Sequence, residues 1–282
     1  MTNRSIESIE PADCFQRARL FAAEVELIRR EAGRPVETRG AVAVTNASPR
    51  ECYFQALASF RKADRLCQEA AGDPMASIPH SAPLGDLRPG HVLGVIDAAL
   101  RELAEVKQAL HVTDKAEQPA REAQRTPSDV FGALATANRQ LNLLLERPFT
   151  PADVFQQVSL AIAYTARLGA EPAAPPAFER AKRPADCYRR LQGCLESARA
   201  IARRNKHQVI DSFTAPSEDS VLPSDVFDVA TLVLGEVAFL HSHSKDATPL
   251  YPFEANMPGR KLPAHVFQLA GVLEKQLQQL AK

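Results

Sequence analysis

A short motif that recurs eight times constrains the fold of this chain more than any other feature. The motif reads x-Pro-[Ala/Ser]-[Asp/His]-[Val/Cys]-[Phe/Tyr]. Clear copies begin at Pro11, Pro127, Pro151, Pro184, Pro223 and Pro263, and degraded copies begin at Pro49 and Pro89. Internal repetition is typical of a chain built from similar structural units. The sequence therefore predicts eight related elements.

Each motif has the residues of a helix start. Proline suits the first helical position, where its missing N–H is not needed and its fixed φ fits the helix. The acid two residues later can accept a hydrogen bond from the N-cap N–H and lies at the positive end of the helix dipole. Ser48, Thr126 and Thr150 are natural N-caps. A capping side chain is missing from the copies led by Arg88, Arg183, Leu222 and Leu262.

The residues after each motif follow helical spacing. After Val130, apolar residues recur at Leu134, Ala137, Leu141 and Leu144, which is one face of an amphipathic helix. We therefore predict an all-α chain of eight amphipathic helices of about 20 residues each. The expected ranges are 11–30, 49–71, 89–110, 127–146, 151–168, 184–205, 223–243 and 263–281.

Most of the expected helices are joined by long Pro-rich segments, such as 170–182. About 15 extended residues reach roughly 50 Å, so successive helices can run parallel. About four residues separate the fourth and fifth helices, and this short joint predicts a tight antiparallel hairpin. It also divides the chain into halves, 1–147 and 148–282. These halves are either two abutting four-helix bundles or parts of one continuous helical repeat array.

The composition excludes several classes of protein. The chain has 34 basic and 34 acidic residues, which argues against nucleic-acid binding and against binding to anionic membranes. No apolar run approaches the ~20 residues of a membrane helix, so we expect no membrane insertion. The first residues lack the apolar region of a signal peptide, and the sequence as given predicts a cytoplasmic protein.

The cysteines predict packing rather than chemistry. Five is an odd number, which argues against a disulfide framework. Cys14, Cys52 and Cys187 occupy the motif position that valine fills in other copies. We expect them to behave as small buried apolar residues.

No motif for catalysis, cofactor binding or metal binding can be identified. GxSxG, HExxH, Walker-type and GxGxxG sequences are absent, so the sequence predicts a protein that is not an enzyme and holds no cofactor. His241 and His243 are two residues apart, whereas zinc ligands on a helix are usually three or four apart. We expect no metal site there.

The sixth repeat is rich in arginine and is the candidate binding surface. A basic face for an acidic partner or a phosphate-bearing ligand would consist of Arg189, Arg190, Arg199, Arg203 and Arg204. The alternative is a solvated face whose charges pair with acids elsewhere. A second candidate, Pro249–Phe253, alternates proline with large apolar residues and is either a recognition strip or an anchor for its linker.

These observations predict a non-enzymatic helical-repeat interaction module, an adaptor or scaffold that binds a protein partner or forms a homo-oligomer. The alternative is a ligand-sensing helical bundle that holds a small molecule between its helices. An enzyme with an unrecognised site is a third reading. Glycines within the expected helices either permit close packing or leave room for a ligand, and they are Gly94, Gly132, Gly193, Gly235 and Gly271.

Overall fold

The structure is a computed structural model that describes residues 6–72, 84–213, 217–248 and 260–282. The candidate strip Pro249–Phe253 lies outside these described residues.

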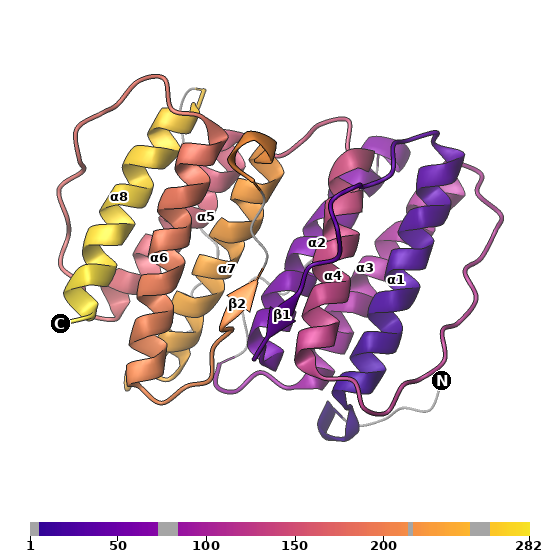
Figure 1. Cartoon of the computed structure of the whole chain (residues 1–282), viewed down its shortest axis with the longest axis horizontal. Helices are drawn as coiled ribbons and strands as arrows, with labels where there is room; N and C mark the ends of the chain where they lie inside the picture. Colours follow the sequence, from indigo (N-terminus) through magenta and orange to yellow (C-terminus); the bar gives the residue numbers. More distant parts are fainter. Residues whose placement is uncertain (1–5, 73–83, 214–216, 249–259) are drawn as a thin grey trace. The chain divides into compact units, whose positions relative to one another are not determined.

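The described residues form eight α-helices, and each begins at the proline of one motif copy (Figure 1). The prediction of an all-α chain is confirmed. The helices are α1 (Pro11–Glu31), α2 (Pro49–Ala71), α3 (Pro89–Ala109), α4 (Pro127–Leu144), α5 (Pro151–Arg167), α6 (Pro184–Arg204), α7 (Pro223–Ser242) and α8 (Pro263–Leu280).

Two kinds of short element accompany the helices. The 3₁₀ turns are η1 (Ile6–Ser8) and η2 (Glu218–Ser220). Two strands, β1 (Val44–Thr45) and β2 (Ser212–Phe213), pair antiparallel with Val44 opposite Phe213. A two-residue ladder is too short to give an alternating sequence pattern, so the all-α prediction did not include these strands.

The motif's acid or histidine serves the same purpose in all eight helices. Its side chain accepts a hydrogen bond from the N-cap backbone N–H, at donor–acceptor distances between 2.6 and 3.0 Å. In α3 and α8 the acceptor is Nδ1 of His91 and of His265. Thr126 and Thr150 also accept from the backbone N–H of the motif aspartate. The motif therefore begins a helix even where the N-cap side chain cannot contribute.

The chain forms two compact units of four helices each. Of the described residues, unit 1 contains 6–72, 87–147 and 210–213. Unit 2 contains 84–86, 148–209, 217–248 and 260–282. Unit 1 thus holds α1 to α4, and unit 2 holds α5 to α8.

Both units have the same packing scheme. In unit 1, α1 and α2 each pack on α3 and α4, and in unit 2, α5 and α6 each pack on α7 and α8. The four motif prolines of each unit line one common pocket, so all four helices begin at the same end and run in the same direction. Each unit is therefore a parallel four-helix bundle. The first and second helices lie at diagonal corners, and so do the third and fourth. The second and third helices are neighbours.

In unit 1 the linkers return along the outside of the bundle. The linker from α3 to α4 runs back along α1, where Gln16 Nε2 donates to Pro119 O (2.6 Å). The linker from α1 to α2 runs back along α4, where Gln140 Nε2 donates to Pro35 O (3.0 Å) and the Ala47 N–H donates to Ser128 Oγ (3.1 Å). These extended segments bring each following helix to the common end (Figure 1).

A linker of unit 2 also returns along the outside of its bundle. The linker from α5 to α6 runs along α8 in the opposite direction, from the N–H of Glu171, which donates to Gln279 Oε1 (2.9 Å), to Phe178 beside His265. In between, Lys275 Nζ donates to Ala174 O (2.9 Å). The linker covers the outer side of α8 and supplies polar acceptors to its side chains.

The expected antiparallel hairpin of the fourth and fifth helices would join the two units and stays a prediction. α4 and α5 belong to different units, and each packs on helices of its own unit. The apolar face of each of these two helices is buried within its own parallel bundle.

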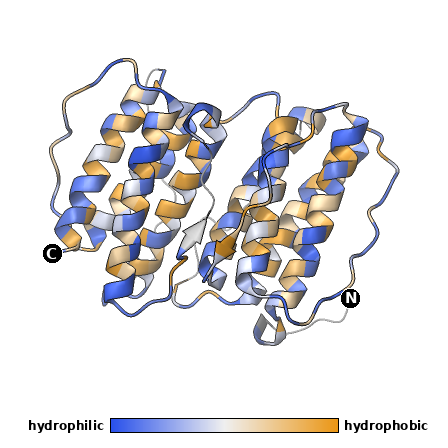
Figure 2. Ribbon diagram, viewed as in Figure 1, coloured by the Kyte–Doolittle hydropathy of each residue, from blue (hydrophilic) through white to orange (hydrophobic). Residues whose placement is uncertain are grey.

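The cores follow the amphipathic pattern of the sequence. Hydrophobic and hydrophilic residues are interspersed along each helix (Figure 2), and the core of each bundle consists of buried apolar side chains. Phe21, Ile96, Leu103 and Leu134 are among the fully buried side chains of unit 1. Within the described ranges no helix is long and apolar enough to cross a membrane.

Candidate functional site

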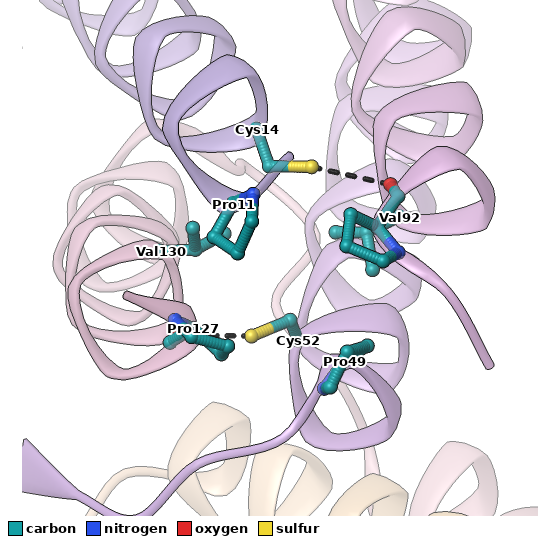
Figure 3. Close-up of a pocket in the computed structure, with 8 residues that line it drawn as sticks. Pro11, Cys14, Pro49, Cys52, Val92, Pro127 and Val130 are labelled. Atoms are coloured by element: carbon teal, nitrogen blue, oxygen red, sulfur yellow. Dashed lines mark hydrogen bonds between the residues drawn. The ribbon is translucent and has the colours of Figure 1, made fainter. Parts of the chain in front are cut away.

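The end of each bundle where the four helices begin is the best-defined candidate site, and we call it the proline end. In unit 1 it is a ring of four prolines around four inward side chains, Cys14, Cys52, Val92 and Val130 (Figure 3). The pocket inside the ring has a volume of about 10 Å³, which is roughly the space of one water molecule.

The cysteines of this ring are packed and inert. Cys14 Sγ donates to Pro89 O and Cys52 Sγ donates to Pro127 O, each at 3.1 Å (Figure 3). In unit 2, Cys187 Sγ donates to Pro263 O at 3.2 Å. Burial raises the pKa of Cys14 and of Cys187 to about 12. The expectation that these residues replace valine as small buried side chains fits this geometry.

The proline end of unit 2 holds a larger apolar pocket. Its volume is about 30 Å³, and its lining consists of proline, valine and cysteine side chains. This space can accept one small apolar group. The lining residues are Pro151, Val154, Pro184, Cys187, Pro223, Val226, Pro263 and Val266.

In unit 1 the surface of the proline end is covered by ion pairs. Arg88 pairs with Glu7 of η1 (2.9 Å), and Arg121 pairs with Asp13 (2.7 Å). Arg125 pairs with Asp129 (3.0 Å) and with Glu122 (2.6 Å), while its guanidinium lies 4.4 Å from the centre of the Phe15 ring. The four N-cap residues are polar or charged: Glu10, Ser48, Arg88 and Thr126. This end is therefore a neutralised polar surface.

Unit 2 instead exposes large apolar side chains at its proline end. Six large apolar residues are exposed in the described part of the chain, and three of them lie here. Leu222 is 41% exposed, Leu262 is 44% exposed, and Phe178 is 44% exposed beside His265. The N-cap residues of unit 1 are polar or charged, and the exposed large apolar residue nearest to them in sequence is Leu84, four residues before the N-cap of α3. The two units share a fold but differ in this surface.

Leu222 and Leu262 are N-cap residues, a position where leucine is among the least favourable residues. They offer no acceptor to the helix. The helix starts remain capped because Asp225 and His265 accept from the leucine N–H groups at 2.8 and 3.0 Å. The exposed leucine side chains therefore contribute nothing to capping, and their presence needs another explanation.

Cations lie close in sequence to the starts of α6 and α8. Arg180, Arg183, Arg260 and Lys261 lie in the segments that lead into α6 and α8, and none forms an ion pair with another described residue. Lys261 Nζ lies 4.8 Å from the centre of the Phe155 ring. On the α7 side, Glu218 pairs with Arg189, and Asp219 is exposed. The surface next to α6 and α8 is basic.

The structure does not bring the five predicted arginines together on one open face. Arg199 is 1% exposed, so it cannot belong to such a face. Arg190 lies against α8, 4.1 Å from the centre of the Phe267 ring and 3.1 Å from Glu274.

The remaining three arginines of that set differ in accessibility. Arg204 donates to the last carbonyls of α8, Leu280 O (2.6 Å) and Ala281 O (2.7 Å). Arg189 pairs with Glu218. Arg203 is exposed. Arg190 and Arg204 thus contact α8, and Arg199 is buried, whereas Arg189 and Arg203 lie on the surface.

The histidines at the end of α7 are packing residues. His241 is 1% exposed, with its ring centre 5.5 Å from that of Tyr164. The Nε2 atom of His243 lies 3.0 Å from Asp86 Oδ1. The residues that the structure describes contain no group of three or more His, Cys, Asp or Glu side chains able to hold a metal ion.

At two of the glycines within helices, a returning linker packs against the helix. A Cβ on Gly132 would lie 2.8 Å from Val42 O, and a Cβ on Gly271 would lie 2.7 Å from Pro176 Cγ. At Gly94 and Gly193 an added Cβ would meet nothing within 4 Å. Gly132 therefore packs against the linker, and Gly271 packs against both the linker and the Arg190 guanidinium of α6.

A third hollow lies on the surface of unit 1, over the linker into α4. It is lined by Glu122, Ala123, Gln124, Arg125 and Asp129. Its charged residues pair with one another, so this hollow offers no unneutralised group to a ligand.

The exposed residues of the unit 2 proline end were not predicted as a site. The sequence did show that Leu222 and Leu262 lack a capping side chain, and this signal could have identified them. It became meaningful only when the fold placed both leucines around one pocket.

Neither a protein-family model, nor a curated protein, nor a solved structure matches this chain.

Proposed function

We propose that the protein is a non-enzymatic interaction module and that the proline end of unit 2 is its binding surface for a protein partner. One observation supports this most directly: two leucines occupy exposed N-cap positions where a polar residue would stabilise the helix by about 1 kcal/mol. Two N-cap residues that are unfavourable for helix stability occur at the same end of one bundle, and this indicates a role other than stability.

The geometry suits a small docking surface. Leu222 and Leu262 begin α7 and α8, which lie at opposite corners of unit 2, and the apolar pocket lies among the four helix starts between them. Exposed apolar residues around a pocket with a polar rim are typical of interaction sites. Unit 1 has the same fold and ion pairs in place of the leucines, so it is an internal control.

The alternative, a small molecule held between helices, stays a prediction. Ligand sites for small molecules usually have volumes of about 300–1,000 Å³. The pockets within the two proline rings measure about 10 and 30 Å³, which favours a partner's side chain over a separate ligand.

Site-specific photo-crosslinking in the native host tests the proposal. A photoreactive amino acid is placed at position 222 or 262 and, as the matched control, at the corresponding N-cap positions of unit 1, Arg88 and Thr126. We expect one and the same partner, identified by mass spectrometry, to be crosslinked from 222 and 262 and not from 88 or 126.

The dependence on the leucines is the second part of the test. Leu262→Ser should lower the crosslinking yield from position 222. Equal yields from the two units, or no partner from 222 and 262, would contradict the proposal. An adduct of twice the chain's mass would replace the adaptor with a homo-oligomer.

A further inference from the structure

We infer that the partner presents an acidic segment with an exposed aliphatic side chain, which enters the pocket of the unit 2 proline end. This inference rests on the proposed function, because it names the chemistry of what that surface binds. The group that occupies the pocket then belongs to a protein segment rather than to a lipid surface or a second copy of this chain.

The pocket determines the size and polarity of the anchoring group. Its lining offers no polar side chain, only proline, valine and cysteine, and its single thiol is already donating to Pro263 O. A polar or charged group placed there would lose its hydrogen bonds to water without replacement. About 30 Å³ suits the end of one aliphatic side chain, with Leu222 and Leu262 providing apolar contacts at the rim.

The surrounding charge determines what flanks that anchor. Arg183 is the exposed N-cap residue of α6, Arg260 and Lys261 precede the N-cap of α8, and Arg180 precedes α6. None of these four forms an ion pair with another residue that the structure describes. In unit 1, by contrast, Arg88, Arg121 and Arg125 have carboxylate partners within the unit.

The parallel topology adds to this positive charge. Four helix N-termini lie at one end, and each contributes a partial positive charge of roughly half an elementary charge. Asp153, Asp186 and Asp225 offset three of them, whereas the fourth helix start is capped by His265. The α8 side of the pocket thus combines an exposed leucine, neighbouring cations and a helix start without a carboxylate, which favours an acidic partner.

Peptide binding to the full chain tests this inference. The probes are three synthetic peptides of about 12 residues. The first has two leucines flanked by glutamate and aspartate, the second has the same leucines flanked by lysine and arginine, and the third is the acidic peptide with serine in place of leucine. Binding is followed by fluorescence anisotropy of labelled peptide at low and high salt.

We expect only the acidic leucine peptide to bind, with an affinity that falls as salt rises. Leu262→Ser and Arg183→Glu should each weaken binding about tenfold. The matched control Arg88→Glu, at an N-cap of unit 1, should leave the affinity unchanged. The far-UV circular dichroism and unfolding midpoint of each variant show whether it is folded.

Several results would overturn the inference. They are equal binding of the basic peptide, no binding of any leucine peptide, and binding that neither Leu262→Ser nor Arg183→Glu weakens. Leucine-dependent cosedimentation with phosphatidylcholine–phosphatidylserine vesicles, without competition by the acidic peptide, would assign the surface to a membrane instead. The crosslinking experiment tests the interaction module independently of the peptide experiment. The proposal of an acidic partner segment can therefore fail while the interaction module holds, and the reverse is also possible.

Discussion

At the scale of single residues, the motif's third helical position is the most informative. An aspartate or glutamate there accepts from the N-cap N–H in six helices, and Nδ1 of a histidine does so in α3 and α8. A neutral imidazole supplies the acceptor but not the negative charge that favours a helix start. The two histidine copies should therefore be weaker starts than the other six.

Replacing His91 with aspartate should stabilise unit 1. The new carboxylate would keep the hydrogen bond from the Arg88 N–H and add a favourable interaction with the helix dipole of about 0.5–1 kcal/mol. The urea midpoint of unfolding, followed by circular dichroism, should rise. His91→Ala, which removes the acceptor, should lower it, and a midpoint for His91→Asp at or below wild type would refute the capping argument.

The buried thiols of unit 1 predict a loss of stability in alkali. The pKa of Cys14 is raised to about 12, and that of Cys52 lies well above its usual value, mainly because both are buried. Their ordinary pKa is 9.0, so the unfolded chain releases these protons first as pH rises. The stabilising contribution is therefore complete below pH 9 and is lost as the pH rises towards 12.

The double substitution Cys14→Val, Cys52→Val isolates this effect, because valine fills the same position in other repeats. Its free energy of unfolding should match wild type within about 1.5 kcal/mol near neutral pH. Between about pH 8 and about pH 10.5 it should fall less than that of wild type. Equal losses would mean that the thiols do not contribute to the alkaline transition.

At the scale of elements, two helices are shaped to receive a linker. The Val42 backbone N–H donates to Thr136 Oγ1 (3.4 Å) while its carbonyl oxygen lies over Gly132. In unit 2, Pro176 lies over Gly271 and its carbonyl accepts from Gln268 Nε2 (2.8 Å). A glycine on the outer face of the last helix in each unit lets the returning chain lie close.

Gly132→Ala and Gly94→Ala should change stability in opposite directions. An added Cβ at position 132 would lie 2.8 Å from a backbone oxygen, so the linker must move, at a cost of about 1–3 kcal/mol. At position 94 nothing lies within 4 Å, and alanine should stabilise the helix by about 0.5–1 kcal/mol. The free energy of unfolding of both variants is measured with denaturant. A Gly132→Ala variant that is more stable than wild type would show that the linker does not pack on α4.

The elements could be predicted from the sequence far better than the surface. Proline and the acid two residues later act locally, so each helix start was visible, and the expected ranges end within two residues of the structure in every case. The arrangement of helices depends on contacts between distant residues, such as Arg17 with Asp97 (2.6 Å). The candidate surface at Leu222 and Leu262 could be recognised only after the fold placed both residues at one end of unit 2.

At the scale of the whole molecule, one packing scheme is used twice. The first and second helices of each unit pack on the third and fourth, and all four run parallel. Parallel bundles need connections as long as the helices, which explains why proline-rich linkers are a large part of the chain. The linkers contribute to the structure, because their backbone atoms form hydrogen bonds with side chains of the helices they cross.

Shortening the linker between α3 and α4 should destroy unit 1. It spans 110–126, and a helix of about 20 residues is roughly 30 Å long. Removing about ten residues leaves about seven, which reach at most roughly 25 Å and cannot return to the proline end. We expect a loss of the cooperative unfolding transition. Insertion of about ten glycine and serine residues, the control, should cost less than about 1 kcal/mol. A cooperative transition in the shortened chain would contradict the parallel arrangement.

The diagonal placement of α1 and α2 has a consequence for biosynthesis. α1 packs on α3 and α4, whose first residues follow its own by more than 75 positions. When α1 and α2 leave the ribosome, the principal partners of α1 do not yet exist. Unit 1 can close only after α4 is complete, so its early helices wait with apolar faces uncovered, as expected of folds dominated by distant contacts. The local helix starts, repeated eight times, favour helical conformations in those segments before their partners are made.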